Sequence, residues 1–467
     1  MIYFSTKTQR ALRATEKILV QLIVLSVLSA LVVILNSCNN SEQPTFTNRI
    51  ASVIYKNCTP CHRTGEAGGY SFVTYKEISK HADLIAAVTK DGYMPPWPAD
   101  TAYSRFCDEF VLTAGELDAL QIWAKSGAPI GDENNIPKPL DFFVDSIHEK
   151  PDLVLKMTES FFIKGDNADK FMIAKLPYEI ANDTFIRAIE FVPYNRKLLH
   201  HMNGHLVSYP EGKKKNVAEG QHLVEMDMDT DQVVIYKQLG LQNDDGTFPT
   251  LTPSVINYLP GVISTVYPEG FGGYRMSKKG AFLLKDLHYG PTPVNDSDQS
   301  VINVYFGNKP PKRPTNELIL GTLGVSEVVP PLQIPPNEVK SFSTEITTTE
   351  KISLLTVNPH MHLLGKSFKA YAVKPNGDTI PLVRINKWDF RWQYFYTYKK
   401  PVIIPKGSRI RAEATFDNTT ANPNNPFSPP RQVGERNTSM RTTDEMFQFI
   451  ITFLPYRKGD ENINLER

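Results

Sequence analysis

The feature that most constrains this chain is a change of hydrophobic periodicity near residue 151. Upstream, apolar residues in NRIASVIYKN and TAGELDALQIWAKSG recur at helical spacing. Downstream, short alternating or β-branched runs such as DQVVIY, FLLKDLHY, SVINVYF and FQFIITF are separated by turn formers such as PNGD and NPNNP. The pattern predicts a small all-α domain followed by all-β sandwiches.

The chain is too long for one ordinary core, and polar segments rich in proline suggest where it divides. One such segment covers 131–150, and KPPKRPTNE forms a second break. We therefore expect a helical domain at 47–130, a linker at 131–150, and β-sandwiches at 151–310 and 311–467. A net charge of +1 gives no basic footprint, so nucleic acid is not an expected partner.

The first 37 residues have the pattern of an export signal. Basic residues precede an uncharged run at 18–35, which ends in LNSC. This segment resembles a bacterial lipoprotein signal, which implies cleavage before Cys38, lipidation of Cys38 and a polar tether over 38–46. The alternative is an uncleaved anchor, because about 18 apolar residues just span a bilayer. Both place the rest in the cell envelope, on the periplasmic side or at the surface.

The segment NCTPCH contains the pattern Cys-x-x-Cys-His. In this pattern two thiols bond a porphyrin and the following histidine supplies an axial ligand. A methionine in DGYMPPWPAD suits the second axial position. These segments and WAKSGAPIGD resemble class I cytochrome c in order. The resemblance implies one covalent haem c, attached at Cys58 and Cys61, with His62 proximal and Met94 distal.

Other interpretations of this segment stay open. Met94 could instead pack in a core. A zinc site at the two cysteines and the histidine would lack a fourth ligand at suitable spacing. We expect His81 to be a surface or packing residue. Cys107 is expected to be a small buried hydrophobe, since four cysteines at these spacings form no disulfide framework.

Five histidines of the β region form three groups, and a methionine in DEM lies farther downstream. These residues are His200 and His201, His288, His360 and His362, and Met446. Imidazole with one thioether suits copper that cycles between Cu(II) and Cu(I), because soft sulfur favours the reduced ion. The alternative is a set of unrelated structural histidines and a core methionine.

Spacing bears on how these histidines could act together. His360 and His362 would share one face of a strand, so both could reach one metal. His200 and His201 would point to opposite faces of a regular strand. Their joint use therefore requires a bulge or a strand end.

The landmarks LLHHM, LHYGP, PHMHLLGKSF, ATFDNT with NPNNP, and DEM occur in a recognisable order. With them, residues from about 151 to 455 resemble the copper type II monooxygenases, the family of peptidylglycine α-hydroxylating and dopamine β-monooxygenases. The resemblance implies two jelly-roll-like sandwiches that each carry one copper ion across a cleft. It assigns an electron-transfer copper to His200, His201 and His288. It assigns the catalytic copper, where dioxygen meets substrate, to His360, His362 and Met446.

Two departures from the family limit what can be carried over. The β region contains no cysteine, whereas the animal enzymes are rich in disulfides. Asn358 stands where the peptide enzyme has an arginine that holds the substrate carboxylate. Peptide amidation is therefore not expected, and the substrate, a small molecule or a peptide-like one, is not identified.

Several other residues have both a functional and a structural interpretation. His205 could be an additional ligand or a residue behind the ligands, but a structural role is favoured. His148 and His222 are interpreted as structural. The aromatic run WDFRWQYFY could line a cleft or carry electrons, and core packing is favoured.

The leading hypothesis is an envelope-tethered copper monooxygenase that hydroxylates an organic substrate with dioxygen. Its electrons would come from an external donor through its own haem. A second hypothesis is a haem and copper protein that transfers electrons or handles copper without hydroxylation. A third is a sugar-directed binding or hydrolytic module, because peptide-N-glycosidases have a similar double sandwich.

Overall fold

A computed structural model describes residues 43–138, 147, 149–226, 231–262, 264, 266–268, 270–309, 313–436 and 441–466. The predicted signal, Cys38 and His148 lie outside the described residues. Within the described ranges, no helix is both long and apolar enough to cross a membrane. The described chain is mostly β-sheet with few helices, as its periodicity predicted.

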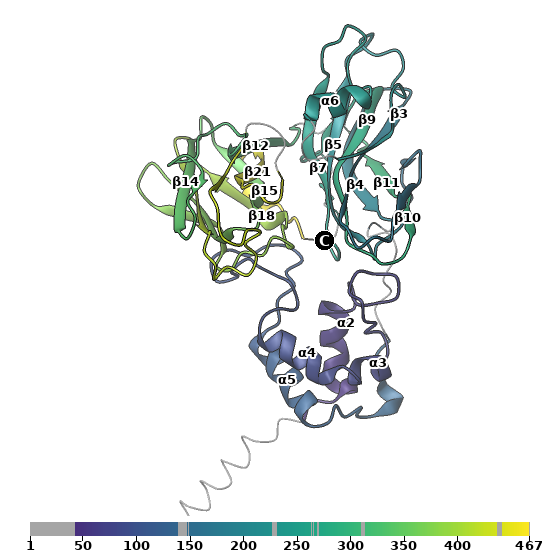
Figure 1. Cartoon of the computed structure of the whole chain (residues 1–467), viewed down its shortest axis with the longest axis vertical. Helices are drawn as coiled ribbons and strands as arrows, with labels where there is room; N and C mark the ends of the chain where they lie inside the picture. The colour runs from purple at the N-terminus through teal and green to yellow at the C-terminus, as the bar shows by residue number, and fades with distance from the viewer. Residues whose placement is uncertain are drawn as a thin grey trace, which may run out of the picture.

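The helices of the N-terminal part group at one end of the molecule (Figure 1). They are η1 (Phe46–Ile50), α2 (Ala51–Asn57), α3 (Tyr75–Ser79), α4 (Ala82–Lys90) and α5 (Ala114–Lys125), followed by the short η2 (Glu133–Asn135). Thr113 and Glu116 form a capping box at the start of α5. Phe46, Ile54 and Trp123 are fully buried in a core that these helices share.

The first β unit contains a five-stranded and a four-stranded sheet. The larger has the order β6 (Leu223–Glu225), β3 (Lys170–Glu179), β9 (Lys279–Tyr289), β5 (Leu199–Tyr209), β7 (Thr250–Tyr258). The smaller has the order β1 (Leu153–Lys156), β11 (Val301–Phe306), β4 (Thr184–Val192), β8 (Tyr274–Met276), and β2 (Phe161–Ile163) pairs with β10 (Asp296–Asp298). Apolar side chains of the five-stranded and the four-stranded sheet form one core.

The prediction of a strand for the run DQVVIY is wrong, because this run forms helix α6 (Gln232–Gln238). Asp231 caps the helix by accepting a hydrogen bond from the Val233 N–H at 2.8 Å. Ile235 packs against the outer face of the five-stranded sheet. A good cap and one buried face therefore outweigh the preference of valine and isoleucine for strands.

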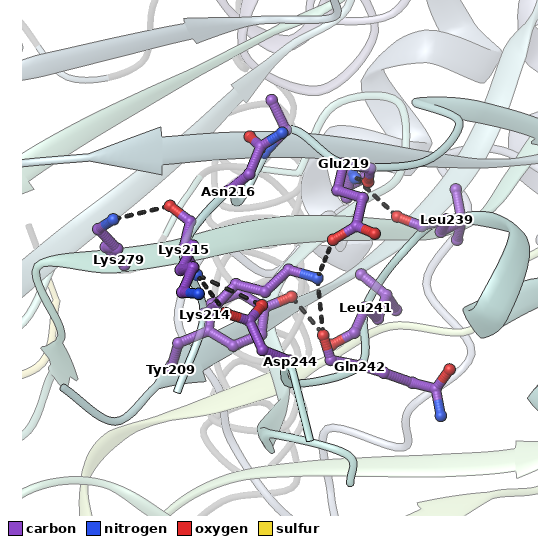
Figure 2. Close-up of polar contacts among 12 residues, drawn as sticks. Tyr209, Lys214, Lys215, Asn216, Glu219, Leu239, Leu241, Gln242, Asp244 and Lys279 are labelled. Carbon is purple, nitrogen blue, oxygen red and sulfur yellow. Dashed lines mark hydrogen bonds and ion pairs between the residues drawn. The ribbon is translucent and has the colours of Figure 1, made fainter. Parts of the chain in front are cut away.

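Buried lysines form hydrogen bonds between the segment around α6 and the five-stranded sheet. Figure 2 shows the Lys214 ammonium between the Glu219 carboxylate at 2.8 Å and the Gln242 carbonyl at 2.7 Å. Lys175 also donates to the Leu239 carbonyl at 2.6 Å. The carbonyls satisfy the ammonium groups, so these lysines stabilise the loop packing.

The second β unit is a sandwich of two four-stranded sheets. One has the order β12 (Asn316–Gly321), β21 (Phe447–Pro455), β15 (Ile352–Met361), β18 (Tyr396–Ile404). The other has the order β14 (Val339–Thr347), β19 (Arg409–Asp417), β16 (Gly365–Val373), β17 (Thr379–Ile385). The short strands β13 (Gln333–Ile334) and β20 (Val433–Gly434) pair beside them, and η3 (Asp460–Asn462) follows β21.

The segment 96–110 leaves the helices and packs on this second sandwich. Asp100 pairs with Arg384 at 2.7 Å, and the Cys107 N–H donates to the Thr397 carbonyl at 2.8 Å. Phe106 is fully buried in the sandwich core. Cys107 is buried, as predicted. The helical part is thereby fastened to the second sandwich, below the two β units in Figure 1.

Candidate metal centre

The first histidine cluster lies where β5 and β9 pair. His201 is opposite His288, and the register shifts on both sides of His201. This irregularity is the bulge that joint use of adjacent histidines requires, and it lets the His200 and His201 rings both approach His288. Their ring centroids lie 5.0 and 4.8 Å from that of His288.

Ring nitrogens of this cluster converge in part. His201 Nδ1 lies 3.3 Å from His288 Nδ1. Two nitrogens bound at 2.0 Å to one tetrahedral metal would lie about 3.3 Å apart. The other nitrogen of His288, Nε2, contacts the Asp169 carboxylate at 2.7 Å, an arrangement that fixes the orientation of a ligating imidazole.

Neighbouring residues shape this cluster. The Phe171 ring stacks on His288 at 4.3 Å. A Cβ added to Gly290 would lie 2.4 Å from His200 Nε2, so only glycine allows the His200 ring to take this position. Burial lowers the pKa of all three imidazoles, that of His201 to about 3. The rings are therefore neutral at neutral pH, the form that binds metals.

The second histidine cluster lies at the end of β15, where β21 begins. The rings of His360 and His362 are 5.1 Å apart and nearly perpendicular. His362 Nδ1 lies 3.0 Å from the Asp444 carbonyl, and His360 Nδ1 contacts the Gln393 side chain. Because both Nδ1 atoms have partners, the two Nε2 atoms are left for a metal. Burial lowers the pKa of both rings, that of His362 to about 3.

A fully buried carboxyl group supports the second cluster from behind. Glu445 accepts hydrogen bonds from the backbone N–H groups of Leu364 at 2.6 Å, His362 at 2.9 Å and Met446 at 3.3 Å. Burial raises the pKa of Glu445 to about 8. One side chain therefore holds the backbone of both His362 and Met446.

The two clusters face one cleft between the sandwiches. His201 lines it from the first sandwich, and His360, His362 and Met446 line it from the second, around a volume of about 650 Å³. Among the described residues, no three His, Cys, Asp or Glu side chains form a preset metal cage. The pairs of imidazoles and the nearby thioether nevertheless fit copper in donor type.

Three of the ambiguous residues have clear surroundings. The Asn358 amide donates to the Tyr394 carbonyl at 2.9 Å, so it holds the segment that carries Gln393. His205 lines the cleft, and its Nδ1 is buried with no hydrogen-bond partner in the described structure. His222 contacts the Ala218 carbonyl at 2.9 Å, in keeping with a structural role.

The aromatic run at 388–396 packs largely as core. Trp388, Tyr394 and Tyr396 are buried in the second sandwich. Phe390 and Gln393 instead line the cleft beside the second cluster. Sequence reasoning missed Asp169, Gln393 and Glu445 as supporting residues, and the acidic residue in the DEM landmark was the one available signal.

The Cys-x-x-Cys-His segment lies at the end of α2, where the His62 N–H donates to the Cys58 carbonyl at 2.9 Å. The His62 ring stacks on Phe72 at 4.7 Å, and its buried Nδ1 has no partner in the described structure. Two thiols and an imidazole in this order fit a covalent haem in donor type. Met94 follows α4, with its N–H on the Val88 carbonyl, and the haem stays a prediction.

His81 behaves as a packing residue. Its Nδ1 lies 2.9 Å from the Glu77 carbonyl, and its ring contacts Tyr70 and Phe72. Cys61 of the helical part lies against the wall of the cleft, which Trp97 and Phe110 also line. A Cβ on Gly261, which lines the cleft, would lie 2.7 Å from Cys61 Sγ.

Imidazole groups from two β-sandwiches around one cleft form a donor set that fits a metal-dependent enzyme. Residues 319–427 match the model of the copper type II ascorbate-dependent monooxygenase C-terminal domain. This match supports a relation of the chain to the copper type II monooxygenase family. It therefore also supports the activity of a copper-dependent monooxygenase, which is an oxidoreductase. It spans β12 to the segment after β19 and includes His360 and His362.

Comparisons with whole proteins add no functional argument. No curated protein matches the chain. A structure of PNGF-II is 10% identical, with a TM-score of 0.26, and the match covers 65% of either chain, less than two thirds of that protein. A structure of infectious bursal disease virus Gt strain is 10% identical, covers 69% of this chain and 87% of that chain, and has a TM-score of 0.15.

Proposed function

We propose that the chain is a copper-dependent monooxygenase that hydroxylates an organic substrate in the cleft between its sandwiches. The observation that carries this proposal is the meeting of His201 with His360, His362 and Met446 around one cleft, in a chain whose second sandwich matches the family. Copper bound there would supply dioxygen activation and the transfer of two electrons. The substrate is an organic molecule small enough for the cleft.

The side chains have distinct tasks in this proposal. His200, His201 and His288 hold one copper ion, with Asp169 orienting His288. His360, His362 and Met446 hold the other, with Gln393 and the Asp444 carbonyl orienting the two rings. The thioether of Met446 favours the reduced ion that meets dioxygen.

We also propose that electrons reach the cleft through the helical part. Cys58 and Cys61 would attach a c-type haem, and His62 and Met94 would be its axial ligands. The support is positional: Cys61 contacts the cleft at Gly261, and Glu66 lies 3.8 Å from Arg196 of the first sandwich. A lipid on Cys38 would tether the protein to a membrane of the cell envelope.

Reoxidation of the reduced protein tests this proposal. Protein expressed with cytochrome maturation, loaded with copper and reduced with dithionite is mixed with dioxygen, and the haem absorbance is followed. We expect fast reoxidation that requires copper and is lost in Met446→Ala. Met226→Ala is the matched control, because Met226 also lines the cleft but belongs to the first sandwich.

Three results would contradict the proposal. Equal reoxidation in Met446→Ala and in the parent would exclude the second cluster from the dioxygen reaction. Copper and haem that cycle without any incorporation of labelled oxygen into product would instead favour the electron-transfer protein. If the protein contained no copper after loading, the remaining hypothesis would be the sugar-directed binding or hydrolytic module.

A further inference from the structure

The wall of the cleft on the first sandwich is polar well beyond the histidine cluster. His201, Asn203 and His205 alternate along β5 and all line the cleft. On β7, Asn257 is the register partner of Asn203 and lines it too. From His201 to His205 the strand advances about 13 Å, so this wall could contact a ligand larger than the reacting group.

Several side-chain atoms of this wall lack the hydrogen bonds that burial demands, among them the Tyr258 hydroxyl on β7. His205 Nδ1 and Asn257 Oδ1 are both shielded from solvent and have no partner in the described structure. A buried polar atom without a partner costs roughly 1–3 kcal/mol. Burial also lowers the pKa of His205 to about 3, so its ring is a neutral donor and acceptor. Both atoms point to a ligand that completes their hydrogen bonds.

The arginines at the cleft argue against an anionic ligand. Arg391 is paired with Asp389 at 2.5 Å, and Arg187 is paired with Glu149. Both guanidinium groups are therefore compensated within the protein.

Position 358, where the peptide enzyme has an arginine that holds the substrate carboxylate, also argues against an anionic ligand. Asn358 carries no charge, and its amide donates to the Tyr394 carbonyl. An anionic group would find these two arginines already paired and would meet no charge at Asn358. A neutral ligand would meet the wall without the cost of burying an unpaired charge.

We propose that Asn203, His205 and Asn257 form a binding subsite for a neutral polyhydroxylated substrate. Its hydroxyl groups would donate to His205 Nδ1 and Asn257 Oδ1, and the Asn203 amide would donate to a hydroxyl oxygen. The subsite extends from the first copper ligand set along β5, in the same cleft that His360 lines from the second sandwich. This inference rests on the proposed function, which it deepens by naming the substrate class.

Calorimetric titration of the intact chain, with and without copper, tests the subsite with three probes. These are cellobiose as a neutral polyol, hippurate as a carboxylate and tyramine as an amine. We expect cellobiose to bind most tightly. His205→Ala and Asn257→Ala should each weaken its binding about fivefold, the size of one lost hydrogen bond. His222→Ala is the control, because His222 belongs to the same sandwich and does not line the cleft.

The outcomes separate this inference from the proposed function. Tighter binding of hippurate or tyramine, no binding of cellobiose, or unchanged affinity in both variants would overturn the subsite. Asn257→Asp provides a variant of the same shape, and circular dichroism checks that each variant is folded. Cellobiose binding that depends on His205 in a chain that takes up no copper would overturn the monooxygenase and keep the subsite.

Discussion

The two histidine clusters differ in how the protein holds them. In the first, a half-exposed Asp169 carboxylate contacts His288, and part of His200 remains exposed to solvent although its ring packs against His288. In the second, neutral groups orient the rings, and the fully buried Glu445 fixes the backbone of His362 and Met446. Under the proposed function, the first site would exchange electrons near solvent, and the second would meet dioxygen at a position held by buried groups.

The largest expected effect is the loss of one complete copper site. His288→Ala and His362→Ala should each reduce bound copper from two ions to one per chain, because each removes a ligand that no neighbour replaces. Metal analysis after dialysis measures this. Loss of both ions in either single variant would show that the two clusters do not bind independently.

Glu445→Ala should give the next largest effect. It leaves the backbone N–H groups of His362, Leu364 and Met446 without an acceptor, so we expect the free energy of unfolding to fall by about 3 kcal/mol. Asp169→Ala should lower it by less than about 1 kcal/mol, because Asp169 is exposed. Denaturant titration of both variants checks the contrast, and equal losses would contradict it.

The supporting residues should affect copper affinity more moderately. Asp169→Ala should weaken copper binding at the first site about tenfold, and Gln393→Ala should do so at the second. Competition with a copper chelator measures both affinities. An effect of Gln393→Ala on the first site, or of Asp169→Ala on the second, would show that these contacts do not act locally.

The smallest expected effect is a pH dependence confined to the first sandwich. Burial lowers the pKa of Lys175 to about 8, from about 10.5 in the unfolded chain. Between these values the unfolded chain binds more protons, so the Lys175 contribution to stability is present above 10.5 and is lost as pH falls through 8. The free energy of unfolding, relative to Lys175→Met, should therefore rise between pH 8 and 10.5. A flat difference would be inconsistent with this burial.

Much of the fold could be predicted because it depends on local pattern. The alternation in FLLKDLHY and FQFIITF corresponds to β9 and β21, and the Thr113 cap begins α5. The strand predicted for DQVVIY was wrong, because the helix that forms there depends on the Asp231 cap and on packing against a sheet that is distant in sequence. The docking of residues 96–110 on the second sandwich also depends on contacts far apart in sequence, such as that of Asp100 with Arg384.

The site could be predicted only as far as its ligand types. Adjacent His200 and His201 signalled a bulge, and the bulge is present. Asp169 and Gln393 had no signal, because each lies more than thirty residues from the histidine it contacts. Whether His205 Nδ1 and Asn257 Oδ1 lack hydrogen-bond partners depends on side-chain packing, which a sequence pattern does not predict.

X-ray absorption at the copper edge tests the central claim most directly. The reduced, copper-loaded chain should contain two copper ions per chain and show scattering from a sulfur atom bound to copper. That sulfur signal should disappear in Met446→Ala and persist in Met226→Ala, with two ions still bound to the control. Persistence of the sulfur signal without Met446, or its absence from the parent protein, would contradict the assignment of the second cluster.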